Sequence, residues 1–314
     1  MNKAIGGYIG LELRQGTHYH ANALPLNTGR NCFEYILKLR GYKHVLLPYY
    51  TCEVMLEPLR KLGISYSFYA IDPSLEPATL PVLHDKEAFV YTNYYGLKQH
   101  AVEQLAKHYG PRLIVDNSQA FFAPRINGID TFYTARKFFG VADGAYVYAD
   151  TPLDIELPRD ESCSRMSHLL TRIDTCAESG YGDYLLHEEQ LCNQPIKSMS
   201  RLTEHILCSI DYEQVRQRRI TNYMVLERAL YGSNKLSLDA SESVPMVYPY
   251  WTENGDTLRD ELRQQRIYIA KYWKNVLDWN SPALEQSLAN DLLALPVDQR
   301  YTPADIETII PLII

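Results

Sequence analysis

The first half of the chain alternates short apolar runs, rich in β-branched and aromatic residues, with segments of helical spacing. The runs predict strands at 44–50, 65–71, 88–94 and 112–116, and the helical spacing predicts helices at 53–62 and 101–109. Strands that alternate with helices are typical of α/β domains whose sheet is mostly parallel. Two more β-rich runs, 131–139 and 144–149, are close enough to predict a hairpin. We therefore expect an α/β fold.

The second half has a different pattern. From about residue 164 to 231 it is helical, with amphipathic stretches at 199–210 and 212–230, which we interpret as a connecting region. The rest holds two short β-like runs, VPMVYPYW and RIYIAKYW, and two helical patterns. We expect a large α/β domain over residues 1–200 and a smaller C-terminal α+β domain over 201–314.

The charge of the chain argues against a nucleic-acid partner. The formal net charge is -7 and the isoelectric point is near 5.7, whereas a nucleic-acid footprint needs clustered Lys and Arg. The one dense basic run, RQRR at 216–219, lies in an amphipathic helical pattern, and we expect it to be a solvated helix face.

Cysteine usage and hydropathy bear on the compartment. The six cysteines are far apart and form no C-x-x-C pair, which favours free thiols in a reducing compartment over disulfides or a zinc site. Residues 1–16 have no apolar core of signal-peptide length. The sequence also contains no uninterrupted run of about 18 apolar residues, the length that a membrane-spanning helix needs. We expect a cytoplasmic protein without a membrane partner.

The segment Thr28-Gly29-Arg30-Asn31 is a candidate phosphate site because it opens a helical pattern. Free backbone amides, the positive end of the helix dipole, a glycine that allows close approach and a hydroxyl together suit a phosphate. The alternative is an ordinary helix that Thr28 caps after a turn. In a mostly parallel sheet, this loop and the loops discussed next would meet at the carboxyl ends of the strands.

A carboxylate ends the apolar run Leu113-Ile114-Val115-Asp116, and Gln119 follows three residues later. Asp116 could hold a pyridine nitrogen protonated, which makes a cofactor ring an electron sink, and Gln119 could hydrogen-bond a ring hydroxyl. An acid at a strand end is also a common helix cap or turn former. Both interpretations stay open at this point.

Lys137 lies in the β-rich run 131–139 with Phe132, Phe138 and Phe139 close by in sequence. Apolar surroundings disfavour a charged amine, so its pKa falls and it becomes a nucleophile for an aldehyde. Thr134 stands three residues earlier. The alternatives are a surface lysine on a strand edge and an ordinary strand threonine.

Other candidates carry weaker signals. The turn 48–52 leads from strand to helix and could set an aromatic ring or the Cys52 thiol against a flat cofactor, although aromatics at strand ends more often belong to the core. Cys52 has no His partner nearby, which disfavours a catalytic nucleophile. His18 and His20 lack further ligands, so we expect no metal site.

The order of these segments resembles the DegT/DnrJ-type sugar aminotransferases, a family of fold-type I enzymes that depend on pyridoxal 5'-phosphate. The similarity covers roughly the whole chain and is strongest from Asn27 to Asp150. The segments that carry it are NTGRN, VLLPYYT, NYYGLK, VDNSQA, TARKFFGVADGAYVYAD and LPVDQRYTPADIETII. The resemblance implies a large domain of the fold-type I kind followed by a smaller one.

The resemblance also implies roles for individual residues. Lys137 would form a Schiff base with pyridoxal phosphate and then move the proton between substrate and cofactor. Asp116 would pair with the pyridine nitrogen, and Gln119 would contact the ring oxygen. The phosphate would be held by Thr28 and the amides of Gly29, Arg30 and Asn31, with Thr134 in an S/T-x-x-K arrangement.

The chain departs from the family pattern in four places. Cys52 stands where many members carry an aromatic ring that stacks on the cofactor. Met199-Ser200-Arg201 stands where members carry an Asn-x-Arg motif that reaches the partner subunit's phosphate, so that Arg201 alone matches. Arg30 and Asn31 replace small residues, and the middle of the chain is shortened.

The activity that the resemblance implies is transfer of an amino group from an amino acid, with glutamate expected, to a nucleotide-linked keto sugar, in a homodimer. One alternative is a sugar dehydratase of the same family, but these replace the lysine with histidine, and Lys137 argues against it. The other is a catalytically degenerate homologue that binds a ligand or partner.

Overall fold

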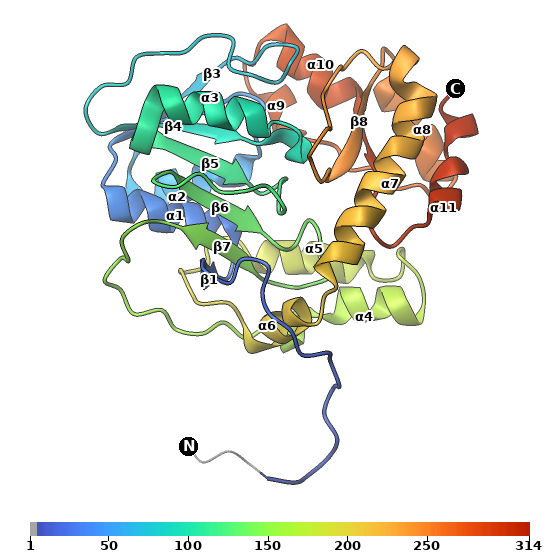
Figure 1. Ribbon diagram of the computed structural model, residues 1–314, viewed down its shortest axis with the longest axis horizontal. Coiled ribbons are helices and arrows are strands. Elements are labelled where there is room, and N and C mark those ends of the chain that lie inside the picture. Colours follow the sequence, from blue (N-terminus) through green and yellow to red (C-terminus); the bar gives the residue numbers. More distant parts are fainter. Residues whose placement is uncertain (1–4) are drawn as a thin grey trace.

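The structure is a computed structural model that describes residues 5–314. The first four residues, which open the segment expected to lack a signal-peptide core, lie outside it. A seven-stranded sheet has the order β1-β7-β6-β5-β4-β2-β3 (Figure 1). Its strands are β1 (Leu24–Leu26), β2 (His44–Pro48), β3 (Ser65–Tyr69), β4 (Glu87–Thr92), β5 (Leu113–Asn117), β6 (Asp130–Thr134) and β7 (Ala145–Tyr148).

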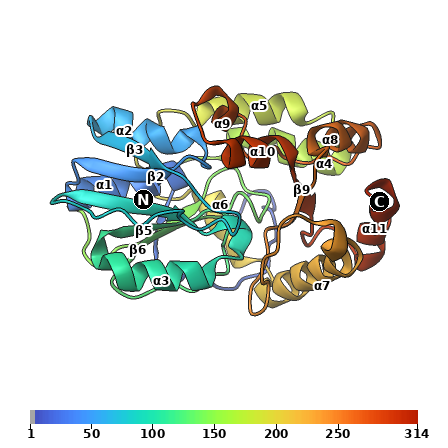
Figure 2. The same ribbon diagram turned by 90° about the horizontal axis from the view of Figure 1, so that it is seen from above.

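The sheet is mostly parallel. Strands β2 to β6 pair in parallel, and β7 alone runs antiparallel to its neighbours β6 and β1. Helices α1 (Gly29–Arg40) and α2 (Leu56–Leu62) cover one face and α3 (Gln99–Tyr109) the other (Figure 2). Alternate strand residues enter the two cores, as Ile114 and Val115 do. The α/β fold predicted from the sequence is confirmed.

Helix α1 begins and ends at capping residues that are recognisable in the sequence. Thr28 is extended and its side chain accepts a hydrogen bond from the amide of Asn31, which confirms it as the N-cap. Gly41 ends the helix at φ 67°, the left-handed conformation that favours glycine. Phe33, Ile36 and Leu37 recur at helical spacing and are buried on one face of α1.

The predicted hairpin is present, but its first strand is shorter than expected. Strand β6 ends at Thr134, and the carbonyl of Ala135 accepts hydrogen bonds from the amides of Phe138 and Phe139. Residues 135–139 thus form a tight turn, although their aromatic content looked strand-like. Lys137 therefore projects from a turn beyond the strand end, not from a strand.

The connecting region consists of helices, as predicted. They are α4 (Ser167–Asp174), α5 (Tyr181–Gln190), α6 (Arg201–Cys208) and α7 (Tyr212–Leu230). The expectation for the run at 216–219 is wrong at one residue, because Arg219 is only 1% exposed. It faces the C-terminal part of the molecule. The local sequence pattern does not show where that part lies relative to α7.

The C-terminal part contains a small antiparallel sheet of β8 (Val247–Trp251) and β9 (Leu292–Pro296). Its helices are α8 (Gly255–Gln264), α9 (Asn275–Asp278), α10 (Ala283–Asp291) and α11 (Pro303–Glu307). The β-like run at 266–273 is not a strand, because it pairs with no strand in the described part of the chain. Its Trp273 ring instead packs edge-on against Tyr50, with 5.0 Å between the ring centroids. The division of the domains at residues 200 and 201 stays a prediction.

Two further observations bear on the sequence analysis. All six cysteines are free thiols. Within residues 5–314, the helices are too short or too polar to cross a bilayer.

Gly144, between the turn of Lys137 and β7, allows a test of the fold. Its φ is 114°, and a Cβ there would come within 2.8 Å of the Thr203 Cγ2 atom. Gly144→Ala should therefore lower the free energy of unfolding by about 2 kcal/mol. Gly140→Ala is the matched control, since a Cβ there meets only Leu169 at 3.8 Å. Equal stability of both variants in urea denaturation would contradict this prediction.

Candidate active site

The loops after β5 and β6 meet at the carboxyl edge of the sheet. Asp116 pairs with Phe132 in the ladder between these strands, so the residues that follow each strand are neighbours. The Lys137 Nζ atom lies 3.3 Å from the Ser118 Oγ atom. The expected convergence of the Asp116 and Lys137 segments is thus present in the structure.

Asp116 is a buried carboxylate, 4% exposed. It accepts hydrogen bonds from the amide of Ser118 at 2.8 Å and from the Thr92 hydroxyl at 3.4 Å. Burial raises the pKa of Asp116, and the nearby Lys137 amine opposes this shift. A cation placed beside this carboxylate would therefore be stabilised by it.

Gln119 is fully buried and held in one orientation. Its Oε1 atom accepts a hydrogen bond from the backbone amide of Tyr95 at 2.8 Å, and an N–H group requires an acceptor there. The Gln119 Nε2 atom has no partner within the described chain. The site thus contains a buried, oriented donor that is available to an oxygen of a bound group.

The turn that presents this amide is the NYYG motif, η2 (Tyr94–Gly96). Tyr95 has φ 58°, unusual for a residue other than glycine, and its hydroxyl contacts that of Tyr50 at 2.9 Å. Gly96 follows at φ 76°, where a Cβ would lie 2.9 Å from the Val244 carbonyl oxygen. Glycine is therefore required at this position.

Lys137 is half-buried, and its burial lowers the pKa of the amine while Asp116 opposes the shift. The Tyr272 ring centroid lies 5.8 Å from its Nζ atom. Its neighbour Arg136 forms an ion pair with Glu188 of α5. Burial raises the pKa of Cys52, which keeps this nearby thiol neutral and agrees with a non-nucleophilic role.

The start of α1 lies against Thr134, the last residue of β6, which stands three positions before Lys137. A Cβ on Gly29 would be 3.8 Å from the Thr134 Cβ atom, so the two candidate phosphate segments are adjacent. The amides of Gly29 and Arg30 have no acceptor among residues 5–314. These N–H groups are available to an anion at the positive end of the helix.

The side chains at this candidate phosphate site already have protein partners. The Thr28 hydroxyl donates to Asn31 Oδ1 at 2.6 Å, and Asn31 Nδ2 donates to the Gln194 carbonyl at 2.9 Å. Arg30 is buried and forms an ion pair with Glu57 at 2.7 Å. Thr134 Oγ1 donates to the carbonyl of Gly144 at 3.4 Å. The available donors at this place are therefore backbone amides.

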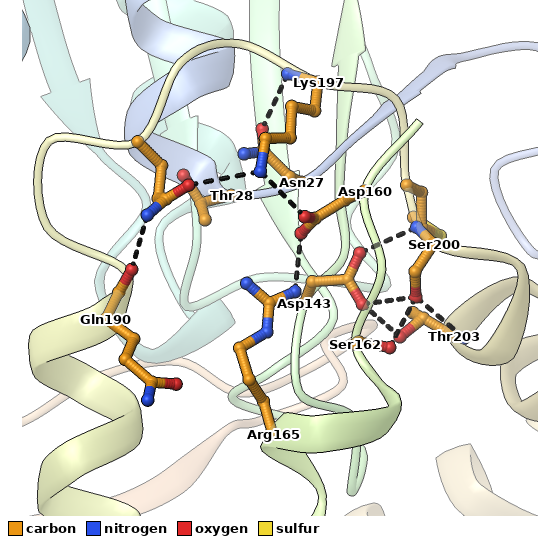
Figure 3. A network of polar contacts seen from close by, with 12 residues as sticks. Asn27, Thr28, Asp143, Asp160, Ser162, Arg165, Gln190, Lys197, Ser200 and Thr203 are labelled. Atoms are coloured by element: carbon orange, nitrogen blue, oxygen red, sulfur yellow. Dashed lines mark hydrogen bonds and ion pairs between the residues drawn. The ribbon is translucent and has the colours of Figure 1, made fainter. Parts of the chain in front are cut away.

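A polar network fixes the loop before α1 to the connecting region (Figure 3). The Asn27 Oδ1 atom accepts from the amide of Lys197 at 3.3 Å, and the Lys197 Nζ atom pairs with Asp160 at 3.1 Å. In the hairpin loop, the buried Asp143 accepts from the Ser200 amide at 2.8 Å and from the Thr203 hydroxyl. The start of α1 is thus positioned by residues far along the chain.

His18 and His20 have structural contacts. His18 Nδ1 lies 2.6 Å from the Tyr146 hydroxyl, and His20 Nε2 lies 2.8 Å from the carbonyl oxygen of Phe121. Burial lowers the pKa of His20 to about 4, so its ring stays neutral at physiological pH.

Three groups at the site were not predicted from the sequence. Tyr272 lies in the run that was interpreted as a strand, and Glu188 of α5 carried no signal. Tyr95 stands in the NYYG motif, whose positive φ could have been suspected from its glycine.

The chemical character of these groups fits pyridoxal phosphate. An amine with a lowered pKa suits an aldehyde, a buried carboxylate suits a pyridinium, and an oriented amide donor suits a ring oxygen. The side-chain amide of Gln119 and the two backbone amides at the start of α1 have no acceptor among residues 5–314, which leaves them available to a bound group.

Comparison with known proteins supports the fold. No family model and no curated protein matches the chain. Solved structures do match, among them a DegT/DnrJ/EryC1/StrS aminotransferase from Brucella abortus, with 16% identity, TM-score 0.62 and coverage of 92% of this chain and 84% of that chain.

DesV from S. venezuelae, solved in complex with a ketimine intermediate, has 16% identity and TM-score 0.63 over 93% of this chain and 83% of its own. The sugar aminotransferase CalS13 from Micromonospora echinospora has 14% identity and TM-score 0.62 over 93% and 87%. The chain therefore has the fold of DegT/DnrJ-type sugar aminotransferases, and the resemblance predicted from the sequence is confirmed at the level of the fold.

The electrostatics of Lys137 predict its reactivity. Because Asp116 raises the pKa of Lys137 against the effect of burial, Asp116→Asn should lower that pKa further. The amine would then be neutral, and reactive, at lower pH than in the unaltered protein. The test is the pH dependence of reductive methylation followed by mass spectrometry, with the exposed Lys107 as internal reference. A midpoint for Lys137 that rises or stays constant would contradict the prediction.

Proposed function

We propose that this protein is a pyridoxal-phosphate-dependent aminotransferase that acts on a keto sugar. One observation carries the proposal. The Lys137 amine, whose pKa is lowered, lies 3.3 Å from Ser118. Ser118 stands between the buried carboxylate of Asp116 and the buried side-chain amide of Gln119, whose N–H donor is unused. The fold supports it, because structures that share the fold include sugar aminotransferases.

When bound, the cofactor would supply an aldehyde and a ring that withdraws electrons. Lys137 would hold the aldehyde carbon and, once released, carry a proton. Asp116 would keep the ring nitrogen protonated, and Gln119 would donate to the ring oxygen. The amides of Gly29 and Arg30 would hold the phosphate, and the Thr134 hydroxyl would join them by leaving its 3.4 Å bond to the Gly144 carbonyl. Cys52 stands in the place of the family's aromatic, and Tyr272 offers a ring beside the amine.

The finer parts of the proposal rest on the resemblance. They are glutamate as donor, a nucleotide-linked keto sugar as acceptor, and a cytoplasmic location, with which six free thiols agree. The degenerate binding protein is the second candidate. It is favoured by the start of α1, where Glu57 neutralises Arg30 and the Thr28 hydroxyl donates a hydrogen bond to the Asn31 side chain. Lys137 argues against the dehydratase.

The half-reaction with an amino acid tests the activity. Protein loaded with pyridoxal phosphate should lose its aldehyde absorbance band and gain that of the amine form when glutamate is added. Lys137→Met should slow this conversion by about 1,000-fold, because it removes the group that moves the proton. Lys107→Met is the matched control on the surface of α3. A stable aldehyde band that no amino acid converts would favour the binding protein.

We also propose that the protein is a homodimer through α4 and α5. These helices expose large apolar side chains, including Leu170, Ile173, Tyr181, Leu185 and Leu186, which range from 46% to 82% exposed. Apolar groups gathered on a surface are typical of an interface. Helix α5 is tied to the lysine turn by the Arg136–Glu188 ion pair, and Arg201 is exposed without an ion pair among the described residues. An interface here would place a second subunit beside the site.

Sedimentation velocity tests the dimer. The double variant Ile173→Asp and Leu186→Asp should sediment as a monomer at micromolar concentration, because it buries two charges in the interface. Val82→Asp is the control, since Val82 is 84% exposed in a loop outside the two helices. Dimers in both variants, or a monomeric unaltered protein, would contradict the proposal.

A further inference from the structure

Arg219 of α7 is a buried cation without a carboxylate partner in the described part of the chain. It is 1% exposed, and burial lowers the pKa of its guanidinium to about 10. Its Nη1 atom donates to the carbonyls of Pro245 at 3.2 Å and Met246 at 3.0 Å. Burying a cation is unfavourable unless its donors are well used, so the contacts of this side chain call for an explanation.

The remaining donors of Arg219 bond the carbonyl of Phe138, the residue after Lys137, directly and through Gln299. Its Nη2 atom donates to the carbonyl of Phe138 at 3.5 Å, and its Nε atom donates to Gln299 Oε1 at 3.0 Å. Gln299 in turn donates from Nε2 to the same carbonyl of Phe138 at 2.7 Å. The guanidinium carbon also lies 4.5 Å from the centroid of the Phe138 ring. One backbone carbonyl is thus held by two side chains.

This carbonyl belongs to the tight turn that carries Lys137. On the other side of the lysine, Ala135 accepts hydrogen bonds from the amides of Phe138 and Phe139 at 3.0 and 2.9 Å. The backbone of Lys137 is therefore fixed before and after the residue. Rotation of the turn would move its amine away from Ser118.

The loop that carries Gln299, the side-chain partner of Arg219, is held in place as well. Asn222, one turn further along α7 and fully buried, donates from Nδ2 to the carbonyls of Val297 at 3.2 Å, Asp298 at 3.3 Å and Tyr301 at 3.0 Å. These bonds hold the loop after β9 around Gln299. A connection therefore runs from α7 and the C-terminal part to the lysine turn.

We propose that Arg219 and Gln299 are positioning residues, which orient the Lys137 amine through the carbonyl of Phe138. The inference rests on the proposed function, since it assigns these residues to the lysine that would hold the cofactor. It explains why a cation is kept in the interior next to this turn. An anchoring role alone would need the bonds to Pro245 and Met246, but not those to Phe138.

Two substitutions separate positioning from anchoring. Gln299→Glu keeps an oxygen for Arg219 and adds an opposite charge, but it removes the donor to the Phe138 carbonyl. Gln299→Met removes both contacts. Gln286→Met is the matched control in α10, where Nε2 of Gln286 donates to the carbonyl of Ser281 at 2.8 Å.

The readouts are the rate at which pyridoxal phosphate forms its visible Schiff-base band, the pH midpoint of that band, and the thermal unfolding temperature. We expect both Gln299 variants to form the band about tenfold more slowly and to shift its pH midpoint. Gln299→Glu should unfold at the temperature of the unaltered protein or above, and Gln286→Met should form the band at the unaltered rate.

Unaltered rates and midpoints in Gln299→Glu would overturn the positioning role and leave the proposed function standing. Slow formation in Gln299→Met alone would have the same meaning, because it would report only a loss of packing. Absence of the band in the unaltered protein would instead refute the proposed function, and with it the role of both residues.

Discussion

The candidate site depends on the opposing charges of Lys137 and Asp116 at the buried carboxyl edge of the sheet. Burial disfavours the charged form of each group, and each supports the charged form of the other. The parallel pairing of β5 with β6 brings their loops together. A cofactor that carries an aldehyde at one end and a basic ring nitrogen at the other would engage both groups.

The parts of the fold that depend on local pattern could be predicted from the sequence. The parallel strands, the Thr28 cap and the span of α7 all follow from side-chain periodicity and end signals. The turn of Lys137 was missed because aromatic residues there resemble a strand, while the carbonyl of Ala135 closes the backbone into a turn. The strand predicted over Tyr272 was wrong because pairing requires a neighbour that no local window contains.

The site itself shows the same division. The order of Asp116, Gln119 and Lys137 along the chain was enough to suggest that they converge. The orientation of Gln119 could not be predicted, since it depends on the amide of Tyr95 from another loop. The burial of Arg219 could not be predicted either, because its contacts come from residues 138, 245, 246 and 299. The lysine turn is thus supported by parts of the chain that are remote in sequence.

The residue to which pyridoxal phosphate attaches shows directly whether Lys137 is the nucleophile of the site. The protein would be incubated with the cofactor, reduced with borohydride, digested and mapped by mass spectrometry. We expect the label on Lys137, at one equivalent per chain. Label on Lys98, which is also buried but paired with Glu76, or label spread over exposed lysines, would contradict it.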